Sequence, residues 1–357
     1  MMIFKVEENN ISDICKLFED VNKYPLSKCT SKEKAKWLYF QNNSGKNYSR
    51  IMLKEKSMLA HWGAIPLKFK RCDKIIKGST SFQLTCRKEA LGSTLFLWRE
   101  IEKELIDEGV VANYNFHNES SHPALVSMGW ETECVPILLT PLRPLQLLSD
   151  IISSKNLNRV LKYLLMIVFC KIDFCLYKLA NLFVKDCNNI KEVNDFDDGD
   201  YDQIWNEMSK SVDSGIVLNS EYMKWRYIEK PNNSYKILSY IESGKVKGYL
   251  VYAITEEFKT SIGVVMDIVA DCNNAKVIKS LIRTAKRKTC QKGATIMTAL
   301  SFKGNIFYQH FTDSWFFNVP KKLLPQQSYF AVKDLNKTDG GIPINRWHVS
   351  WGCHDKW

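Results

Sequence analysis

The sequence lacks the cysteine pairs that stabilise small secreted domains or bind zinc. Its eleven cysteines are an odd number at scattered positions, and no two of them form a Cys-x-x-Cys pair. A disulfide framework typically shows an even set of cysteines, and a structural zinc site needs clustered Cys and His ligands. The sequence therefore predicts reduced, mostly buried cysteines and no metal site.

It also lacks a secretory signal and an uninterrupted membrane span. Residues 1–10 show no basic region followed by an apolar stretch and a small-residue cleavage site, so we expect a cytoplasmic protein. The most apolar segment, residues 157–184, carries Lys162, Lys171, Asp173 and Lys178. A spanning helix needs about 20 mostly uncharged residues. We expect an amphipathic connector between domains, with docking on a membrane surface as the alternative and no transmembrane segment.

Length and charge indicate a two-domain protein with an anionic partner. The chain has 357 residues, 45% of them hydrophobic, which is enough for two ordinary cores. Its net charge of +11 suits nucleic acid, an acidic membrane or a ligand with several phosphates. Because the lysines are dispersed and no zinc-finger or RRM signature is present, we expect no nucleic-acid partner.

The first 114 residues alternate between strand and helix patterns. Apolar spacing predicts a strand, two helices, an antiparallel meander of three strands, a helix and a further strand. These elements are expected at residues 3–6, 11–21, 33–40, 50–53, 58–69, 75–86, 94–106 and 110–114. A polar turn follows the last strand, and Pro123 fits the first turn of a short helix that Gly129 ends. Polar side chains therefore gather where a strand ends.

The segment from Asn115 to Trp130 resembles Gly-Phe-Pro-Asn-x-x-Ser-x-x-x-(Phe/Leu)-x-x-x-Gly-Trp of double-domain acyltransferases in the GNAT superfamily. The matching residues are Phe116, Asn118, Ser121, Leu125, Gly129 and Trp130. Asn115 stands where the pattern has Gly, and His117 where it has Pro. The resemblance implies a fold of two GNAT-like α/β/α domains with mixed, mostly antiparallel sheets, joined by a helical connector. We place these units at residues 1–145, 146–190 and 191–357.

In such a domain, acyl-CoA lies where two parallel strands separate, with its pyrophosphate at the start of the next helix. Unpaired backbone groups can bond the pantetheine amides, and the helix dipole favours phosphate. The resemblance places these contacts at Leu84, Thr85, Cys86, Arg87, Gly92, Ser93 and Thr94. The loop Glu89–Thr94 keeps Gly92 but lacks the other residues of the usual phosphate motif, and the alternative is that Gly92 only starts a helix.

The second half repeats the pattern in weaker form. Residues 218–227 resemble the start of the second domain in the same double-domain proteins, and strands are expected at 235–241, 248–255, 261–270 and 294–301, with a basic helix at 275–288. The loop 271–274 has no glycine and carries an acid, so we place acyl-CoA in the first domain. We then assign acceptor contacts to Trp225, Arg226, His348 and Asp355. Asp267 alternates with apolar neighbours on an expected strand, and because burying an unpaired carboxylate is costly we expect it to face the cleft and contact a sugar hydroxyl or amine.

Direct acyl transfer needs a base for the amine, a donor to the oxyanion and a proton for the departing thiolate. His117 or His122 can act as the base, Asn118 can orient the acceptor, and Ser121 can hydrogen-bond the CoA sulfur. Each has a structural alternative: His122 as a helix cap, the other residues as turn formers, and Asp267 as half of a salt bridge.

The resemblance implies an acyl-CoA-dependent N-acyltransferase for O-antigen or capsule synthesis. Its acceptor would be a nucleotide-linked amino sugar such as a dTDP-3-amino-3,6-dideoxyhexose, and the acyl group acetyl or 3-hydroxybutanoyl. Acyl-CoA is then a co-substrate and no cofactor is permanently bound. A peptidoglycan-type transferase that uses aminoacyl-tRNA and a non-catalytic GNAT-like binding protein remain as alternatives. The sequence leaves the acyl chain, the sugar and the oligomeric state open.

Overall fold

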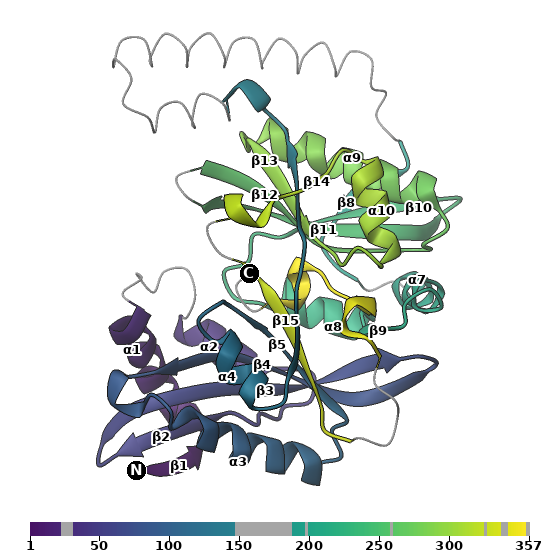
Figure 1. Cartoon of the computed structure of the whole chain (residues 1–357). Coiled ribbons are helices and arrows are strands. Elements are labelled where there is room, and N and C mark those ends of the chain that lie inside the picture. Colours follow the sequence, from purple (N-terminus) through teal and green to yellow (C-terminus); the bar gives the residue numbers. More distant parts are fainter. Residues whose placement is uncertain are drawn as a thin grey trace, which may run out of the picture.

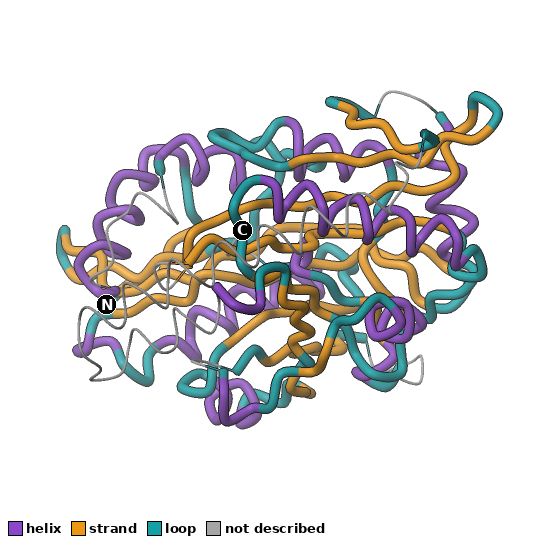
Figure 2. Tube along the Cα trace, turned by 90° about the horizontal axis from the view of Figure 1, so that it is seen from above, coloured by secondary structure: helices purple, strands orange, loops and turns teal. Residues whose placement is uncertain are grey.

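The computed structural model describes residues 1–22, 31–146, 188–196, 199–257, 260–324, 327–336 and 342–354. These residues form two sheets, one above the other in Figure 1, each flanked by helices. Seen from above, the strands occupy the middle of the molecule and the helices lie around them (Figure 2). The predicted helical connector, residues 146–190, lies almost entirely outside the described ranges.

The first sheet is built mainly from the N-terminal part of the chain. Its main path runs β1-β2-β3-β4-β5-β15-β6, and β9 and β16 extend it from β3. Only β4 with β5 and β9 with β16 are parallel. The strands are β1 (Met2–Lys5), β2 (Arg50–Lys54), β3 (Ser57–Arg71), β4 (Lys74–Cys86), β5 (Ala112–His117), β6 (Glu131–Cys134), β9 (Ser214–Ile216), β15 (Tyr329–Asp334) and β16 (Trp347–His348).

Helices cover both faces of this sheet because the side chains of its strands alternate between two apolar layers. On one face, Trp62 of β3 packs with Trp98 of α3 (Thr94–Asp107) and near α4 (His122–Ser127). On the other face, Ile65 and Phe82 share a core with α1 (Ile11–Asn22) and α2 (Lys32–Phe40). A short helix η1 (Glu8–Asn10) leads into α1.

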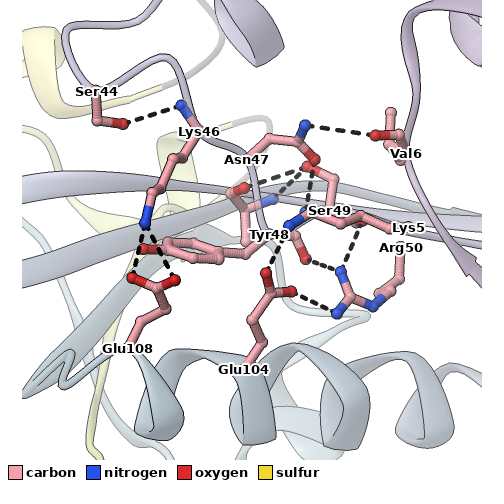
Figure 3. Close-up of polar contacts among 11 residues, drawn as sticks. Lys5, Val6, Ser44, Lys46, Asn47, Tyr48, Ser49, Arg50, Glu104 and Glu108 are labelled. Atoms are coloured by element: carbon pink, nitrogen blue, oxygen red, sulfur yellow. Dashed lines mark hydrogen bonds and ion pairs between the residues drawn. The ribbon is translucent and has the colours of Figure 1, made fainter.

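Ion pairs fix the C-terminal half of α3 against the first strands (Figure 3). Glu104 accepts from Lys5 Nζ and from Arg50 Nη2, each at 2.5 Å. Glu108 at the end of the helix accepts from Lys46 Nζ at 2.9 Å. Arg50 is only 11% exposed, so its bond is screened less than a surface pair would be. These contacts hold the axis of α3 and thereby the position of its N-terminus.

The second sheet has the order β14-β7-β13-β12-β11-β10-β8. Its neighbours are antiparallel except for the parallel pair β12 and β13. Its strands are β7 (Ile137–Pro141), β8 (Ile190–Val193), β10 (Lys236–Glu242), β11 (Lys245–Glu257), β12 (Thr260–Ala270), β13 (Ile296–Leu300) and β14 (Phe317–Asn318). Helical segments accompany them at α7 (Asp200–Ser209), α8 (Ser220–Met223), η4 (Lys224–Ile228), α9 (Ala275–Gln291) and α10 (Ile306–Asp313).

The two sheets exchange strands across the expected domain boundary. β7 precedes residue 145 but pairs with β13 and β14 of the second sheet. β15, near the C-terminus, inserts between β5 and β6 of the first sheet. A division of the chain at 145 and 191 therefore stays a prediction, and each sheet depends on residues from the other half of the chain.

Most predicted elements are confirmed, including the antiparallel meander β2-β3-β4 and the helix that carries Pro123 in its first turn. The fold class is confirmed as well: both sheets are mixed and mostly antiparallel. Among the boundaries that differ, the one nearest the candidate site was wrong by several residues. The strand expected at 110–114 begins at Ala112 and continues to His117, because Asn115 and His117 still pair with β15. Residues expected in the polar turn therefore belong to the strand.

Candidate active site

The parallel strands β4 and β5 separate before they end. Their pairing runs from Gly78 with Ala112 to Ser81 with Asn115, whereas β4 continues to Cys86 and β5 to His117. At the last paired position, Asn115 Nδ2 donates to the Ser81 carbonyl at 2.8 Å. Within the described residues, the β4 backbone beyond this point has no strand partner on the side of β5. Such a fork leaves backbone groups for an amide-rich ligand.

Beside this fork, β4 is kinked at Gln83. Gln83 has a φ of 52°, which is uncommon for a residue with a side chain, and the register with β3 shifts between His61 and Gly63. His61 Nδ1 lies 3.1 Å from the Gln83 carbonyl oxygen, and Tyr39 Oη lies 3.0 Å from Gln83 Oε1. Burial lowers the pKa of His61 to about 4, so the ring is neutral and its proton is assigned to Nδ1, facing the carbonyl. Tyr39 and His61 thus hold the kink in place.

The loop between β4 and α3 ends at an exposed glycine. Gly92 has a φ of +86°, a left-handed conformation that glycine adopts without strain, and Ser93 precedes the helix without capping it. The start of α3 thus presents backbone amides and the positive end of the helix dipole. Arg87 is directed elsewhere, since it donates to Asp20 Oδ2 at 2.6 Å and to the Met58 carbonyl.

A pocket lies between the two sheets, on the face of the first sheet opposite α3. Strand alternation explains its location: Thr80, Phe82 and Tyr114 line it, whereas Ser81 and Asn115 point to the other face. Its lining comes from five parts of the chain, namely α2, β3 with β4, β5, the segment 222–230 and residues 352–354. The fork between β4 and β5 therefore opens beside this pocket.

Aromatic and cationic side chains form one wall of the pocket. Trp37 and Trp225 stack with their ring centroids 4.7 Å apart, and Trp37 Nε1 donates to the Trp225 carbonyl at 3.1 Å. Lys230 Nζ lies 5.6 Å from the centroid of the Trp37 ring and donates to Tyr235 Oη at 2.7 Å. With Lys34 and Arg226, the lining has three basic side chains, and no described residue of the lining has a carboxylate. The pocket is therefore electropositive.

The C-terminal segment forms the opposite wall and is held by buried groups from both halves. Arg226 donates to the Gly352 carbonyl at 3.0 Å and to the His354 carbonyl at 2.8 Å. Asp267, which is 1% exposed, accepts from Ser350 Oγ at 2.5 Å and from Tyr227 Oη.

A further contact comes from β5, where Tyr114 Oη donates to the Cys353 carbonyl at 3.0 Å. Burial raises the pKa of the Asp267 carboxyl to about 6. Asp267, which we expected to contact the acceptor, lies behind the pocket wall.

The two predicted catalytic histidines lie together at the end of β5. His117 Nε2 is 3.3 Å from His122 Nδ1, and both rings pack against Tyr329. Burial and the neighbouring His122 lower the pKa of His117 to about 4. His117 alternates with Tyr114 and Phe116, so its side chain is on the α4 face of the sheet, across from the pocket.

The polar turn after β5 is organised around Asn118. Its Oδ1 accepts from Ser120 Oγ at 2.6 Å, from the Ser121 amide at 3.1 Å and from Ser121 Oγ at 3.2 Å. Asn118 and Ser121 therefore stabilise the turn that precedes α4. The structure brings both residues next to His117 and His122.

The remaining predicted residues lie at the fork, in the pocket lining, in the core or outside the described ranges. Leu84, Thr85 and Cys86 lie on β4 beyond the fork, and Trp225 and Arg226 line the pocket. His348 is buried against Phe307 and is not part of the pocket lining. Asp355 lies outside the described residues.

Sequence reasoning missed the pocket residues Trp37, Gln83, Tyr114 and Lys230, and it missed Tyr39 and His61, which hold Gln83. No local signal marks them, because they come from α2, β3, β4, β5 and the segment after η4, and only the tertiary fold brings them together.

Comparison with known proteins supports the architecture. No protein-family model and no curated protein matches the chain. Solved structures do match.

Saccharomyces cerevisiae N-myristoyltransferase with bound myristoyl-CoA and inhibitors matches with a TM-score of 0.61 at 12% identity, covering 93% of this chain and 80% of that one. A GCN5-related N-acetyltransferase from Anabaena variabilis gives 0.62 at 9% identity, covering 94% and 73%. A probable N-acyltransferase from Enterococcus faecalis V583 gives 0.59 at 12% identity, covering 94% and 72%.

The chain has the GNAT fold. At these identities the likeness establishes the fold alone. None of the helices in the described ranges combines the length and the hydrophobicity needed to cross a bilayer.

Proposed function

We propose that the protein transfers an acyl group from acyl-CoA to the amine of a nucleotide-linked amino sugar, by direct attack of the amine on the thioester. The observation that carries this proposal is the fork between β4 and β5, which opens beside an electropositive, aromatic pocket. One side of the sheet offers backbone groups and a helix N-terminus, and the other offers a binding site for a second substrate.

Acyl-CoA would bind from the side of α3. Its pantetheine amides would bond the unpaired β4 backbone near Leu84, Thr85 and Cys86, and its pyrophosphate would lie at Gly92–Thr94. The anchoring of α3 by Glu104 keeps this N-terminus fixed relative to β4. Because Arg87 is already paired with Asp20, the backbone amides rather than Arg87 would provide most of the phosphate binding.

The acceptor would occupy the pocket on the opposite face. A nucleotide-linked sugar carries a flat base, which can stack on Trp37 or Trp225, and two phosphates, which suit Lys34 and Lys230. A cationic acceptor would meet three basic side chains and no carboxylate in the lining. This balance supports an anionic acceptor such as a dTDP-amino sugar.

In the reaction, the nitrogen of the neutral amine forms a bond to the thioester carbon. The oxyanion that develops accepts a hydrogen bond from a backbone N–H near the kink of β4. Collapse of this intermediate breaks the C–S bond, the amine loses a proton and the CoA thiolate gains one. Positioning and one well-aimed oxyanion donor supply much of the rate, the donor alone about 10²- to 10³-fold.

We assign the proton transfers to the cluster at the end of β5. Because His117 lies on the α4 face, across from the pocket, the amine would reach it through the gap where β4 and β5 separate. His117 Nδ1 is buried and makes no hydrogen bond within the described residues. The neutral ring can therefore accept a proton from the amine at this nitrogen. Ser121 is the candidate donor to the CoA sulfur, and Asn118 orients the turn that carries it.

The test measures acceptor-dependent thiol release. The purified protein is incubated with acetyl-CoA or 3-hydroxybutanoyl-CoA and a panel of dTDP- and UDP-linked amino sugars, against a control without acceptor. Release with one sugar is the expected result. Lys230→Met should raise the KM for that sugar, whereas the exposed Lys245→Met serves as the matched control. Absence of release with every pair, together with no thermal stabilisation by CoA, would refute the proposal.

A further inference from the structure

Within the described residues, one imidazole lines the pocket on the acceptor side of the first sheet. His354 is part of the lining, and its ring packs on that of Phe116 with the ring centroids 4.9 Å apart. Phe116 lies one residue beyond Asn115, the last β5 residue that pairs with β4, and its side chain points to the opposite face from that of Asn115. His354 therefore lies on the pocket side of the sheet, at the mouth of the fork.

Side chains from both halves of the chain fix the backbone that carries this ring. His354 directly follows the short helix η7 (Trp351–Cys353), and Arg226 of η4 donates to its carbonyl at 2.8 Å. Tyr114 of β5 donates to the carbonyl of the preceding residue at 3.0 Å. A general base must be held within hydrogen-bond reach of the group that it deprotonates, and rigid support of this kind provides that.

The other titratable side chains of the described lining are poor proton acceptors near neutral pH. They are three basic groups and three weak acids, namely Lys34, Arg226, Lys230, Tyr114, Tyr222 and Cys353. Burial raises the pKa of the Cys353 thiol to about 12 and raises the pKa of both tyrosines above the usual 10. Asp267 lies behind the pocket wall, where Ser350 Oγ donates to it. Imidazole is the side chain that exchanges protons at neutral pH, so His354 is the base that this wall offers.

We propose that His354 is a second catalytic base, which takes the first of the two protons that the acceptor nitrogen loses. The inference rests on the proposed function. A sugar amine would enter the pocket as an ammonium ion, because such amines keep their proton below roughly pH 8, and an ammonium nitrogen has no lone pair for attack. One N–H bond breaks, its electron pair stays on nitrogen, and the proton passes to the His354 ring.

The second proton leaves the nitrogen only after the C–N bond has formed, and it is the one assigned to His117 on the other face of the sheet. Of the two protons, one ends on the CoA thiol and the other in solvent, so the reaction balances without a further reactant. Each imidazole then serves the face of the sheet on which it lies.

The test compares two variants in the thiol-release assay, with the amino sugar that the wild type uses. His354→Phe keeps a ring that can pack on Phe116, and His354→Gln keeps a polar side chain. Both should lose about 10²-fold in kcat/KM at about pH 7, and both should return to within about threefold of the wild type at about pH 9.5, where the amine arrives neutral. His117→Asn is the comparison variant, and its loss should persist at the higher pH.

The melting temperature and the binding of dTDP or UDP, measured by titration calorimetry, should match the wild type in both variants. Wild-type rates in both variants at the lower pH would overturn the inference. A loss of equal size at both pH values, or one explained by weaker nucleotide binding, would overturn it as well. The absence of thiol release by the wild type with every acceptor is a different result, which would refute the proposed function and this inference together.

Discussion

Replacing Asp267 by Asn is expected to remove a pH dependence of stability that the wild-type chain carries. Burial raises the pKa of Asp267 from 3.8 to about 6, and it outweighs the hydrogen bonds of Ser350 and Tyr227 and the charge of Arg226, which lower it. The folded chain therefore binds this proton more tightly than the unfolded chain does. The resulting stability is fully present below about pH 3.8 and is lost as the pH rises through about 6.

The magnitude follows from the size of the shift. A change from 3.8 to about 6 is roughly 2.2 units, or about 3 kcal/mol of unfolding free energy at 1.36 kcal/mol per unit. Between pH 5 and pH 8, where other carboxylates change little, the same two pKa values give about 1 kcal/mol. Asn keeps the shape of the side chain, and the two hydroxyls that contact it can each donate or accept a hydrogen bond.

The assay is urea unfolding at pH 5, 6, 7 and 8, followed by circular dichroism, for the wild type and Asp267→Asn. Only the difference in unfolding free energy between the two proteins is used, because other groups titrate in both. From pH 5 to pH 8, the wild type should lose about 1 kcal/mol of unfolding free energy relative to the variant. The exposed Asp73→Asn should show no such trend. A difference that stays constant, or that changes in favour of the wild type, would refute the reasoning.

Three further predictions concern the pocket and the end of β5. Gly352→Ala should destabilise the fold by about 1–3 kcal/mol, measured by urea unfolding, because its Cβ would overlap the Asp267 carboxylate; an unchanged midpoint would contradict this packing. Trp37→Ala should raise the KM for the acceptor about tenfold in the thiol-release assay and leave the KM for acyl-CoA unchanged, and an equal rise in both would argue against separate sites. Replacing His117 and His122 together by Asn should lower kcat about 10²-fold. Because the pKa of His117 is lowered to about 4, the wild-type rate should show no His117 step above pH 6, and an intact rate in the double variant would remove the assigned role.

The elements of the first sheet could be predicted because their patterns are local. The meander β2-β3-β4 consists of apolar runs separated by short polar turns, and α3 repeats its apolar residues with helical spacing. The end of β5 was placed too early because Asn115 and His117 are polar. In the structure both residues still pair with β15. Propensity at these positions favours a turn, and the ladder with β15 overrides it.

The candidate site was only partly predictable because contacts between distant parts of the chain determine which side chains reach it. Asp267 alternates with apolar residues on β12, which suggested a side chain facing a cleft, but the C-terminal segment covers it. Contacts such as Arg226 with the Gly352 carbonyl join residues far apart in sequence. No spacing rule encodes such pairs, so a single sequence identifies the fork and its loop better than the pocket beside it.

The strand exchange between the sheets has a consequence for how the protein is made. Within the described residues, β6 pairs only with β15, so the first sheet stays open at β5 and β6 until residues 329–334 have left the ribosome. An open edge of this kind pairs readily with other chains. The N-terminal half should therefore emerge as an incomplete sheet that depends on chaperones or rapid synthesis, and it completes its architecture only after β15 has been synthesised.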